Sequence, residues 1–406
     1  MRLGFIKNII VTFALLITIT MKIFTLFILL LSNLLLSQQS INRETKGITI
    51  TKTDNVKNIV DSVLHKMITK PLIHSASIGM VYHGKEYIGH YGELEEGKKN
   101  IPNNETIYEI GSLSKTLTGI LTVKAVQDKK LHIDDDVQKY LAESYPNLKF
   151  KNRPVKIKDL LSHTSGIPGM LPPEANTILQ NFTDHDTPAK LNTLYRNYNK
   201  KDFLTDLHQV RIDTISGYKY SYSSAGTQLM AAILEKVYKT DFEKLLTDYL
   251  SENMGAEHTK ITLSNQELKR LASGYHSDNP VITSPMPILP WGASGNIKST
   301  LPDMVKYIRF LLQKNEIIQE SFRPLVKFDP EFSIGYFWNI ITDKKLGTYY
   351  LHHGGVPRSQ CYIYIIPKYE LGIFIITNQS GNNTASVMEE ALNEIFDKII
   401  QSNPKS

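Results

Sequence analysis

The sequence has few of the features that mark several common classes of protein. It contains a single cysteine, Cys361, so no internal disulfide can form. It has no long run of lysine or arginine, and three of the cations behind its net charge of +6 (Arg2, Lys7 and Lys22) lie in the first 37 residues, which contain no acid. The rest of the chain is therefore only mildly basic, and no nucleic-acid partner is expected.

Motifs for metal and nucleotide chemistry are also missing. No H-E-x-x-H, paired C-x-x-C or phosphate loop occurs, and the twelve histidines form no set with ligand spacing. The G-x-S-x-G elbow of many hydrolases fails at residues 292–296, where the last residue is Asn296 instead of glycine. The acidic run 134–136 is typical of a helix start. The sequence therefore predicts no metal site.

The first 37 residues have the composition of a targeting segment. From Met21, a short basic start leads into an apolar stretch over 23–36, followed by Ser37 and Gln38. This order is typical of a secretory signal peptide that is cleaved after a small residue. The alternative is an uncleaved membrane anchor, because the stretches 9–20 and 23–36 together are long enough to span a bilayer. We expect an exported protein, periplasmic or secreted, with membrane association as the alternative.

The remaining chain predicts one large domain over residues 53–406, after a polar linker at 38–52. A hydrophobic content of 41% is enough for a sizeable core. A helix after Asp54 and a hairpin are predicted near the N-terminal end of this domain, and four strands and an amphipathic helix near its C-terminal end. A helical subdomain is expected between about 130 and 285. The predicted strands are 76–82, 86–91, 333–340, 348–352, 361–366 and 372–377, and the predicted later helices are 304–312, after a capping box at Thr300, and 387–399. We predict an α+β fold in which both ends share one antiparallel sheet, with the helical subdomain inserted.

The stretch from Glu109 to Gly119 contains the strongest candidate for catalysis. Ser112 and Lys115 are three residues apart, and the apolar run 117–126 that follows predicts a buried helix. Residues i and i+3 share one face of a helix, so the lysine amine can reach the serine hydroxyl. A desolvated lysine can activate that hydroxyl as a nucleophile. The alternative is that Ser112 only caps a core helix and Lys115 extends to the helix end.

Two further stretches carry polar groups that suit the same chemistry. Tyr222 lies in a loop just before a predicted helix with Leu229 and Ile233 on one face. A loop tyrosine is usually packed, and its phenol could act as a base only beside cations that favour phenolate. His353 and Gly355 end a predicted strand. Taken alone, they indicate only a histidine before a glycine turn.

Together these stretches resemble a known family, and their order and spacing carry the likeness. The chain resembles the penicillin-recognising serine hydrolases over about residues 54–400, in the class C β-lactamase-like branch that includes D-amino-acid peptidases and serine esterases. The matching segments are Ile110–Lys115 (nucleophile motif), Asp159–Gly166 (D-L-L-S-H-T-S-G), Tyr220–Ser224 (where relatives have Y-S-N), Gly292–Thr300 (a structural landmark) and His353–Gly355 (where relatives have K-T-G or H-x-G).

The resemblance implies a mechanism and a β-lactamase-like fold. Ser112 would attack a carbonyl and become acylated, while Lys115 and Tyr222 share the proton transfers. The backbone N–H groups of Ser112 and Val356 would form the oxyanion hole beside Gly355. Water would then release the acyl group from a small-molecule or peptide substrate. No metal or cofactor is implied.

Two departures from the family pattern point away from an efficient β-lactamase. Ser224 replaces an asparagine whose amide contacts substrate and the lysine in relatives, and serine is shorter with one donor. His353 replaces a lysine and is charged only below about pH 6.5 unless its pKa is perturbed. We expect His353 to orient substrate, and it is a candidate hydrogen-bond partner of Tyr222. Arg358 is a candidate for a replacement cation.

Three functions remain open at this point. The first is a serine hydrolase acting on an ester or on a D-amino-acid amide, and the second is a true β-lactamase. The third is a catalytically silent penicillin-binding or sensing protein, which Ser224 and the possible anchor suggest. Because Ser112, Lys115 and Tyr222 are all retained, the sequence favours an enzyme over a silent protein.

Overall fold

The computed structural model of the chain describes residues 52–402, so the expected targeting segment and nearly all of the expected linker lie outside the described residues. Eight strands form one antiparallel sheet in the order β2-β1-β14-β13-β12-β11-β10-β9. Because the hairpin β1–β2 pairs with β14, the two ends of the domain share this sheet, as predicted. The strands are β1 Ser75–Tyr82, β2 Lys85–Gly92, β9 Val326–Lys327, β10 Phe332–Gly335, β11 Trp338–Asp343, β12 Gly347–Val356, β13 Ser359–Ile366 and β14 Leu371–Thr377.

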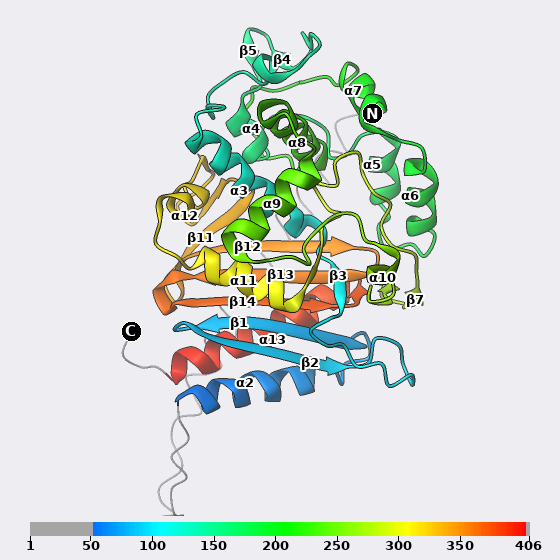
Figure 1. Cartoon of the computed structure of the whole chain (residues 1–406), viewed down its shortest axis with the longest axis vertical. Coiled ribbons are helices and arrows are strands. Elements are labelled where there is room, and N and C mark those ends of the chain that lie inside the picture. The colour runs from blue at the N-terminus through cyan, green and yellow to red at the C-terminus, as the bar shows by residue number, and fades with distance from the viewer. Residues whose placement is uncertain (1–51, 403–406) are drawn as a thin grey trace, which may run out of the picture. The chain divides into compact units, whose positions relative to one another are not determined.

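Helices cover both faces of the sheet, with α2 and α13 on one face and the larger helical layer on the other (Figure 1). The alternation of side chains along β14 shows this directly. Ile373 and Ile375 join the core beneath α2 and α13, whereas Phe374 and Ile376 join the core beneath the helical layer. The sheet is therefore buried on both sides, which explains why β14 is buried at every position and almost wholly apolar instead of alternating with polar residues.

The segment 130–285 carries the helices α4 to α10, which build most of the larger helical layer. In that part of the chain which the structure describes, no helix is both long and apolar enough to cross a bilayer. The α-helices are α2 Lys52–Met67, α3 Ser114–Gln127, α4 Ile157–Leu161, α5 Glu174–Leu179, α6 Thr187–Tyr195, α7 Lys200–Leu207, α8 Ser224–Tyr238, α9 Phe242–Met254, α10 Asn265–Leu268, α11 Leu301–Leu311, α12 Glu316–Ser321 and α13 Asn382–Gln401. The minor strands are β3 Ile107–Glu109, β4 Lys149–Phe150, β5 Arg153–Pro154, β6 Tyr275–His276, β7 Val281–Ile282, β8 Lys298–Thr300 and β15 Gln379–Ser380.

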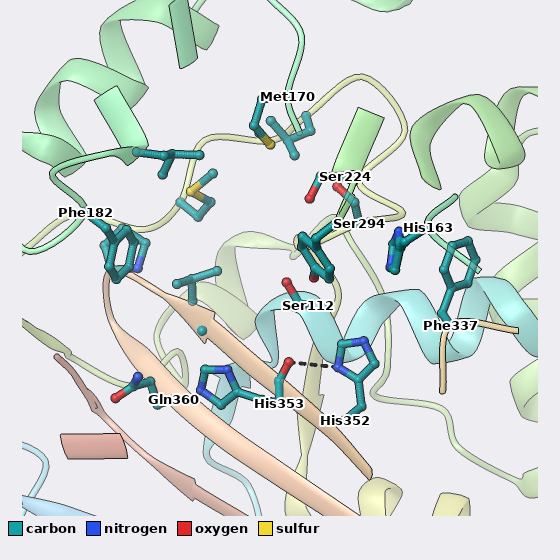
Figure 2. Close-up of a pocket in the computed structure, with 18 of the residues that line it drawn as sticks. Ser112, His163, Met170, Phe182, Ser224, Ser294, Phe337, His352, His353 and Gln360 are labelled. Carbon is teal, nitrogen blue, oxygen red and sulfur yellow. Dashed lines mark hydrogen bonds between the residues drawn. The ribbon is translucent and has the colours of Figure 1, made fainter. Parts of the chain in front are cut away.

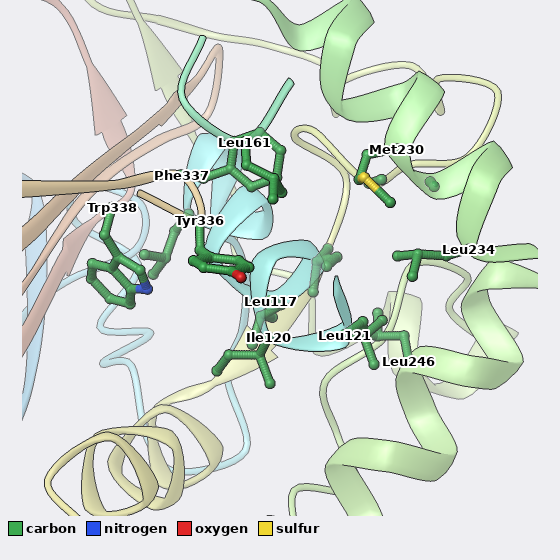
Figure 3. Packing of buried hydrophobic residues seen from close by; sticks show 14 of the residues in the cluster. Leu117, Ile120, Leu121, Leu161, Met230, Leu234, Leu246, Tyr336, Phe337 and Trp338 are labelled. Atoms are coloured by element: carbon green, nitrogen blue, oxygen red, sulfur yellow. The ribbon is translucent and has the colours of Figure 1, made fainter. Parts of the chain in front are cut away.

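The prediction of a single strand over 333–340 was wrong, because the chain reverses there into the hairpin β10–β11. Its turn residues, Tyr336 and Phe337, both have left-handed backbone angles, with φ of 49° and 69°. Neither residue type favours that conformation, so no turn signal is visible in the sequence. Figure 3 shows both rings inserted beside Leu117 and Leu161, and the Phe337 N–H donates to the Leu161 carbonyl at 2.8 Å. Burial of the two aromatic rings stabilises a turn that local preferences disfavour.

The predicted capping box at Thr300 was also wrong, although the helix is present. Thr300 is the N-cap residue of α11, but its side chain makes no capping hydrogen bond. The Asp303 carboxylate instead accepts hydrogen bonds from the backbone N–H of His258 at 2.7 Å and from the Thr259 hydroxyl at 3.0 Å. Asp303 therefore ties the loop after α9 to the start of α11.

Candidate active site

Ser112 lies in a 3-10 turn, Gly111–Leu113, that runs directly into α3, so it precedes the α-helix instead of opening it. The turn packs against the end of β12, and two glycines allow this close approach. A Cβ on Gly354 would lie 2.1 Å from the Ile110 carbonyl oxygen, and one on Gly111, where φ is +54°, would lie 2.7 Å from the Gly355 nitrogen. The fold thus places the candidate nucleophile in contact with His353–Val356, the end of β12, which the sequence had already indicated.

Lys115 is the second residue of α3, one turn after Ser112, and its amine reaches Ser112 as predicted. Its Nζ is 3.2 Å from Ser112 Oγ and donates to the Ser294 carbonyl oxygen at 2.6 Å. The Ser294 hydroxyl in turn accepts a hydrogen bond from Gln228 Nε2 at 2.9 Å. Gln228 lies on α8, one turn after Ser224. These contacts hold the amine between the nucleophile and a fixed backbone carbonyl.

The environment of Lys115 makes its amine a base near neutral pH. The side chain is fully buried (0% exposed), and no carboxylate within residues 52–402 forms an ion pair with it. Burial disfavours the charged ammonium and lowers the pKa of Lys115 to about 7. At neutral pH a large fraction of the amine is therefore uncharged, with a lone pair available to accept the Ser112 proton.

Tyr222 lies in the loop before α8, where the sequence placed it, and faces the same pair of residues. Its hydroxyl hydrogen-bonds Ser112, and the Lys115 amine lies 4.7 Å from the centre of its ring. Although 40% of the Tyr222 surface is exposed, the surrounding protein disfavours phenolate and raises the pKa of Tyr222 well above its usual value. The neutral phenol can relay or donate a proton, whereas the uncharged amine of Lys115 can accept one.

Two buried histidines complete the surroundings of the nucleophile. His163 Nδ1 accepts a hydrogen bond from the Ser223 N–H at 3.2 Å, and its ring lies 4.5 Å from that of Tyr222. His352 Nδ1 donates to the His353 carbonyl at 2.8 Å, as Figure 2 shows. Burial, and secondarily the proximity of Lys115, lower the pKa of His163 well below its usual value and that of His352 to about 3. Both rings are therefore neutral, and neither can compete with Lys115 for a proton near pH 7.

A cavity of about 460 Å³ opens at Ser112, and the remaining predicted residues line it. Ser224, His353, Gly355 and Val356 all contribute to its wall. The expected hydrogen bond between His353 and Tyr222 is not formed: His353 packs on Tyr362, and its Nε2 is buried without a partner among the described residues. Burial also lowers the pKa of His353 to about 4, so this ring is uncharged.

The suggestion that Arg358 supplies a cation to the site is not supported. Its guanidinium donates to the Ala272 carbonyl, and it does not line the cavity. Its charged neighbour is the buried Glu109, whose proximity partly offsets the lowering of the Arg358 pKa by burial. Arg358 therefore belongs to the packing behind the turn and not to substrate binding.

Comparisons with known proteins agree with this geometry. A sequence model of the family described as Beta-lactamase matches residues 60–395. The chain belongs to the beta-lactamase family. Protein flp of Staphylococcus aureus (strain MRSA252) is 25% identical over 355 residues, covering 84% of this chain and 67% of that protein. A beta-lactamase of Providencia stuartii is 28% identical over 259 residues, covering 64% of this chain and 60% of that protein.

The solved structures confirm the β-lactamase-like fold. The beta-lactamase/D-alanine carboxypeptidase of Yersinia pestis, crystallised with citrate, matches with a TM-score of 0.71 at 18% identity, covering 85% of this chain and 98% of that one. The predicted resemblance is thus confirmed at the level of family and fold. The chain is a member of the serine hydrolase superfamily of β-lactamases and penicillin-binding proteins.

Three residues of this beta-lactamase family member that contribute to the site were given no role by the sequence. Ser294 stood out only as part of a failed elbow motif and of the structural landmark Gly292–Thr300, and it contacts Lys115 through a backbone carbonyl, which leaves no sequence signal. Gln228 was hidden in the apolar face of α8. His352 had a visible signal, because it adjoins His353 at the end of a predicted strand.

The low pKa of Lys115 predicts the pH dependence of any ester hydrolysis by this protein. Deprotonated Lys115 is the active form, so kcat/KM should rise about tenfold per pH unit below about pH 7 and level off above it. The measurement is kcat/KM for a 4-nitrophenyl ester between pH 5 and pH 9, corrected for spontaneous hydrolysis. The His353→Gln variant should keep the same inflection, since the pKa of His353 is about 4. An inflection that disappears in this variant would contradict the assignment of Lys115 as the base.

Proposed function

We propose that this protein hydrolyses uncharged carboxylic esters through an acyl-enzyme on Ser112. The observation that carries this proposal is the chemistry of the cavity beside the nucleophile. The described residues that line it include no Asp, Glu, Lys or Arg, and its histidines are neutral near pH 7. A substrate carboxylate buried there would meet no cation, which is costly, whereas a neutral ester carries no such cost.

The proposed reaction has two steps that use the same proton-transfer groups. Lys115 takes the Ser112 hydroxyl proton as Oγ bonds to the ester carbonyl carbon. The bond to the leaving oxygen then breaks, and that oxygen receives the proton from Lys115, directly or through the Tyr222 hydroxyl. A water molecule, deprotonated in the same way, attacks the acyl carbon and releases a carboxylic acid and free Ser112. Backbone N–H groups of Ser112 and Val356 are the proposed donors to the oxyanion.

The two departures from the family pattern favour an ester over a β-lactam. An amide nitrogen must be protonated as it leaves, whereas an ester oxygen leaves more readily, so precise positioning of the leaving group matters less. β-Lactams and peptides ending in D-alanine also carry a carboxylate. His353, uncharged near pH 7, gives that group no cationic partner in the cavity, and Ser224 is too short to replace an asparagine amide.

A direct comparison of substrates tests this preference. We expect kcat/KM for a short-chain aryl ester to exceed that for a cephalosporin in the wild type. The double variant Ser224→Asn with His353→Lys should shift the ratio towards the cephalosporin, by about tenfold for each 1.4 kcal/mol of recovered transition-state binding. A wild-type protein that prefers the cephalosporin would overturn ester hydrolysis as the main function and favour a β-lactamase.

A further inference from the structure

The cavity has an apolar side whose wall is contributed by the chain segment from the end of the Asp159–Gly166 motif through α6, together with the loop 284–290. Six apolar side chains form this wall, hereafter the apolar bay: Met170, Leu179, Phe182, Leu191, Met286 and Leu289. Figure 2 shows Phe182 on one side of Ser112 and Met170 above it, whereas His163 and Phe337 lie on the other side. The bay therefore adjoins Ser112 and lies apart from His163, the histidine that packs on Tyr222.

The bay is backed by a small hydrophobic cluster of its own. Met170, Leu191 and Leu289 belong to this cluster, which is distinct from the two main cores and includes residues of α5 and α6. The cluster packs behind the wall and supports it from the side away from the cavity. An apolar wall of this kind favours an apolar group of the substrate, because burial removes that group from water.

Specific hydrogen bonds fix the wall in place. The Asn176 side chain accepts from the Met170 N–H at 2.9 Å and donates to the Met170 carbonyl at 3.0 Å. In the loop 284–290, the Pro285 carbonyl, next to Met286, accepts a hydrogen bond from the Asn192 side chain of α6 at 3.2 Å. The Tyr195 hydroxyl donates to the Leu171 carbonyl at 3.0 Å. The bay is thus a built surface, held at its backbone on both sides.

The position of the proton-transfer groups indicates which part of an ester enters the bay. The leaving oxygen must receive a proton from Lys115 or Tyr222, and Tyr222 packs against His163. In Figure 2, His163 lies on the other side of Ser112 from Phe182. With the leaving group directed towards Tyr222, the chain on the other side of the carbonyl carbon extends towards the bay.

We infer that the apolar bay binds the acyl chain of the substrate and makes the protein selective for uncharged esters of medium-length aliphatic acids. This inference rests on the proposed ester hydrolysis and adds the substrate class. Each methylene that the bay removes from water should raise kcat/KM about fourfold, until the bay is full.

Two ester series distinguish the acyl side from the alcohol side. In the first, 4-nitrophenol is esterified with acids of two to eight carbons, and in the second, acetate is esterified with straight-chain alcohols of two to eight carbons. We expect kcat/KM to rise over the shorter acids of the first series and to stay nearly flat across the second. A rise only in the alcohol series would overturn the acyl assignment.

Variants of the bay then test which residues set the chain length. Leu179→Trp should fill the bay and lower the hexanoate-to-acetate ratio of kcat/KM at least tenfold. Leu179→Ala should move the optimum to a longer acid, so the two variants shift the preference in opposite directions. Ile178→Trp is the matched control, because Ile178 packs against the same cluster but does not line the cavity, and it should keep the wild-type ratio.

The outcomes separate this inference from the proposed function. The acyl-binding role of the bay is overturned if Ser112-dependent turnover does not depend on acyl length. It is also overturned if both Leu179 variants show the same dependence on acyl length as the wild type. Either result leaves the proposed ester hydrolysis in place. No Ser112-dependent turnover of any ester overturns the proposed function itself. A rise with acyl length that both Leu179 variants shift, and that Ile178→Trp does not, supports both.

Discussion

Replacing Ser112 with alanine is expected to abolish ester turnover. The value of kcat/KM should fall on the order of 10⁵-fold, towards the rate of uncatalysed hydrolysis. No other described hydroxyl lies in the same position relative to Lys115, whose amine is 3.2 Å from Ser112 Oγ. The measurement is kcat/KM for a 4-nitrophenyl ester in matched preparations of the wild type and variant.

Ser114→Ala is the control for this experiment, and the structure sharpens what it should do. Ser114 is buried, donates to the Gly111 carbonyl at 2.7 Å and accepts from the Ile297 N–H at 3.2 Å. Its loss should lower the melting temperature, because a buried N–H loses its partner, while Ser112-dependent turnover persists. Full activity in Ser112→Ala, or a complete loss only in Ser114→Ala, would contradict the assignment of the nucleophile.

The second large effect is expected at Lys115. Lys115→Met keeps an unbranched side chain of similar length but removes the base, so kcat should fall by about 10³-fold. The rise of kcat/KM near pH 7 should disappear from the residual activity. Loss of activity without loss of the pH-dependent rise would show that another group is the base.

The stability of the Lys115→Met variant should rise while its activity falls, which distinguishes a catalytic role of Lys115 from a structural one. In the wild type, the pKa of Lys115 is about 7 when folded and about 10.5 when unfolded. Between these two pKa values the unfolded state binds more protons than the folded state, so the free energy of unfolding rises with pH over this window. Below the folded-state pKa, burial of the Lys115 amine lowers the free energy of unfolding by its full amount. Methionine has no such penalty, so Lys115→Met should melt at a higher temperature than the wild type at pH 7. A lower melting temperature would show that the hydrogen bond to the Ser294 carbonyl outweighs the burial of the amine.

The sequence predicted the parts of the molecule that depend on local spacing. The three-residue separation of Ser112 and Lys115 correctly placed the two side chains in contact, because the turn and the helix keep them on one face. The short, mostly apolar runs at β1 and β14 likewise predicted strands close to their observed bounds, and the fold class followed from strands at both ends.

What the sequence could not predict depends on contacts between distant segments. The Tyr336–Phe337 turn is stabilised by tertiary packing against its own local preferences, so it was predicted as continuous strand. Arg358 was a candidate for a replacement cation at the substrate, but the hairpin between β12 and β13 directs its side chain towards Glu109 and Ala272. The apolar bay combines residues from about 170 to 190 with others near 286, and no pattern within either segment indicates that they face one cavity.

The most direct test of the central claim is intact-mass analysis of the wild-type protein after brief exposure to a slowly hydrolysed aryl ester, with peptide mapping of the adduct. Parallel samples contain a penicillin or a D-alanyl-D-alanine peptide. Our account predicts an ester-derived mass increase equal to the acyl group minus one hydrogen, located on Ser112 and absent from Ser112→Ala, with less adduct from the other two substrates. An adduct on any residue other than Ser112, or turnover of the ester without any covalent intermediate under conditions that slow deacylation, would contradict it.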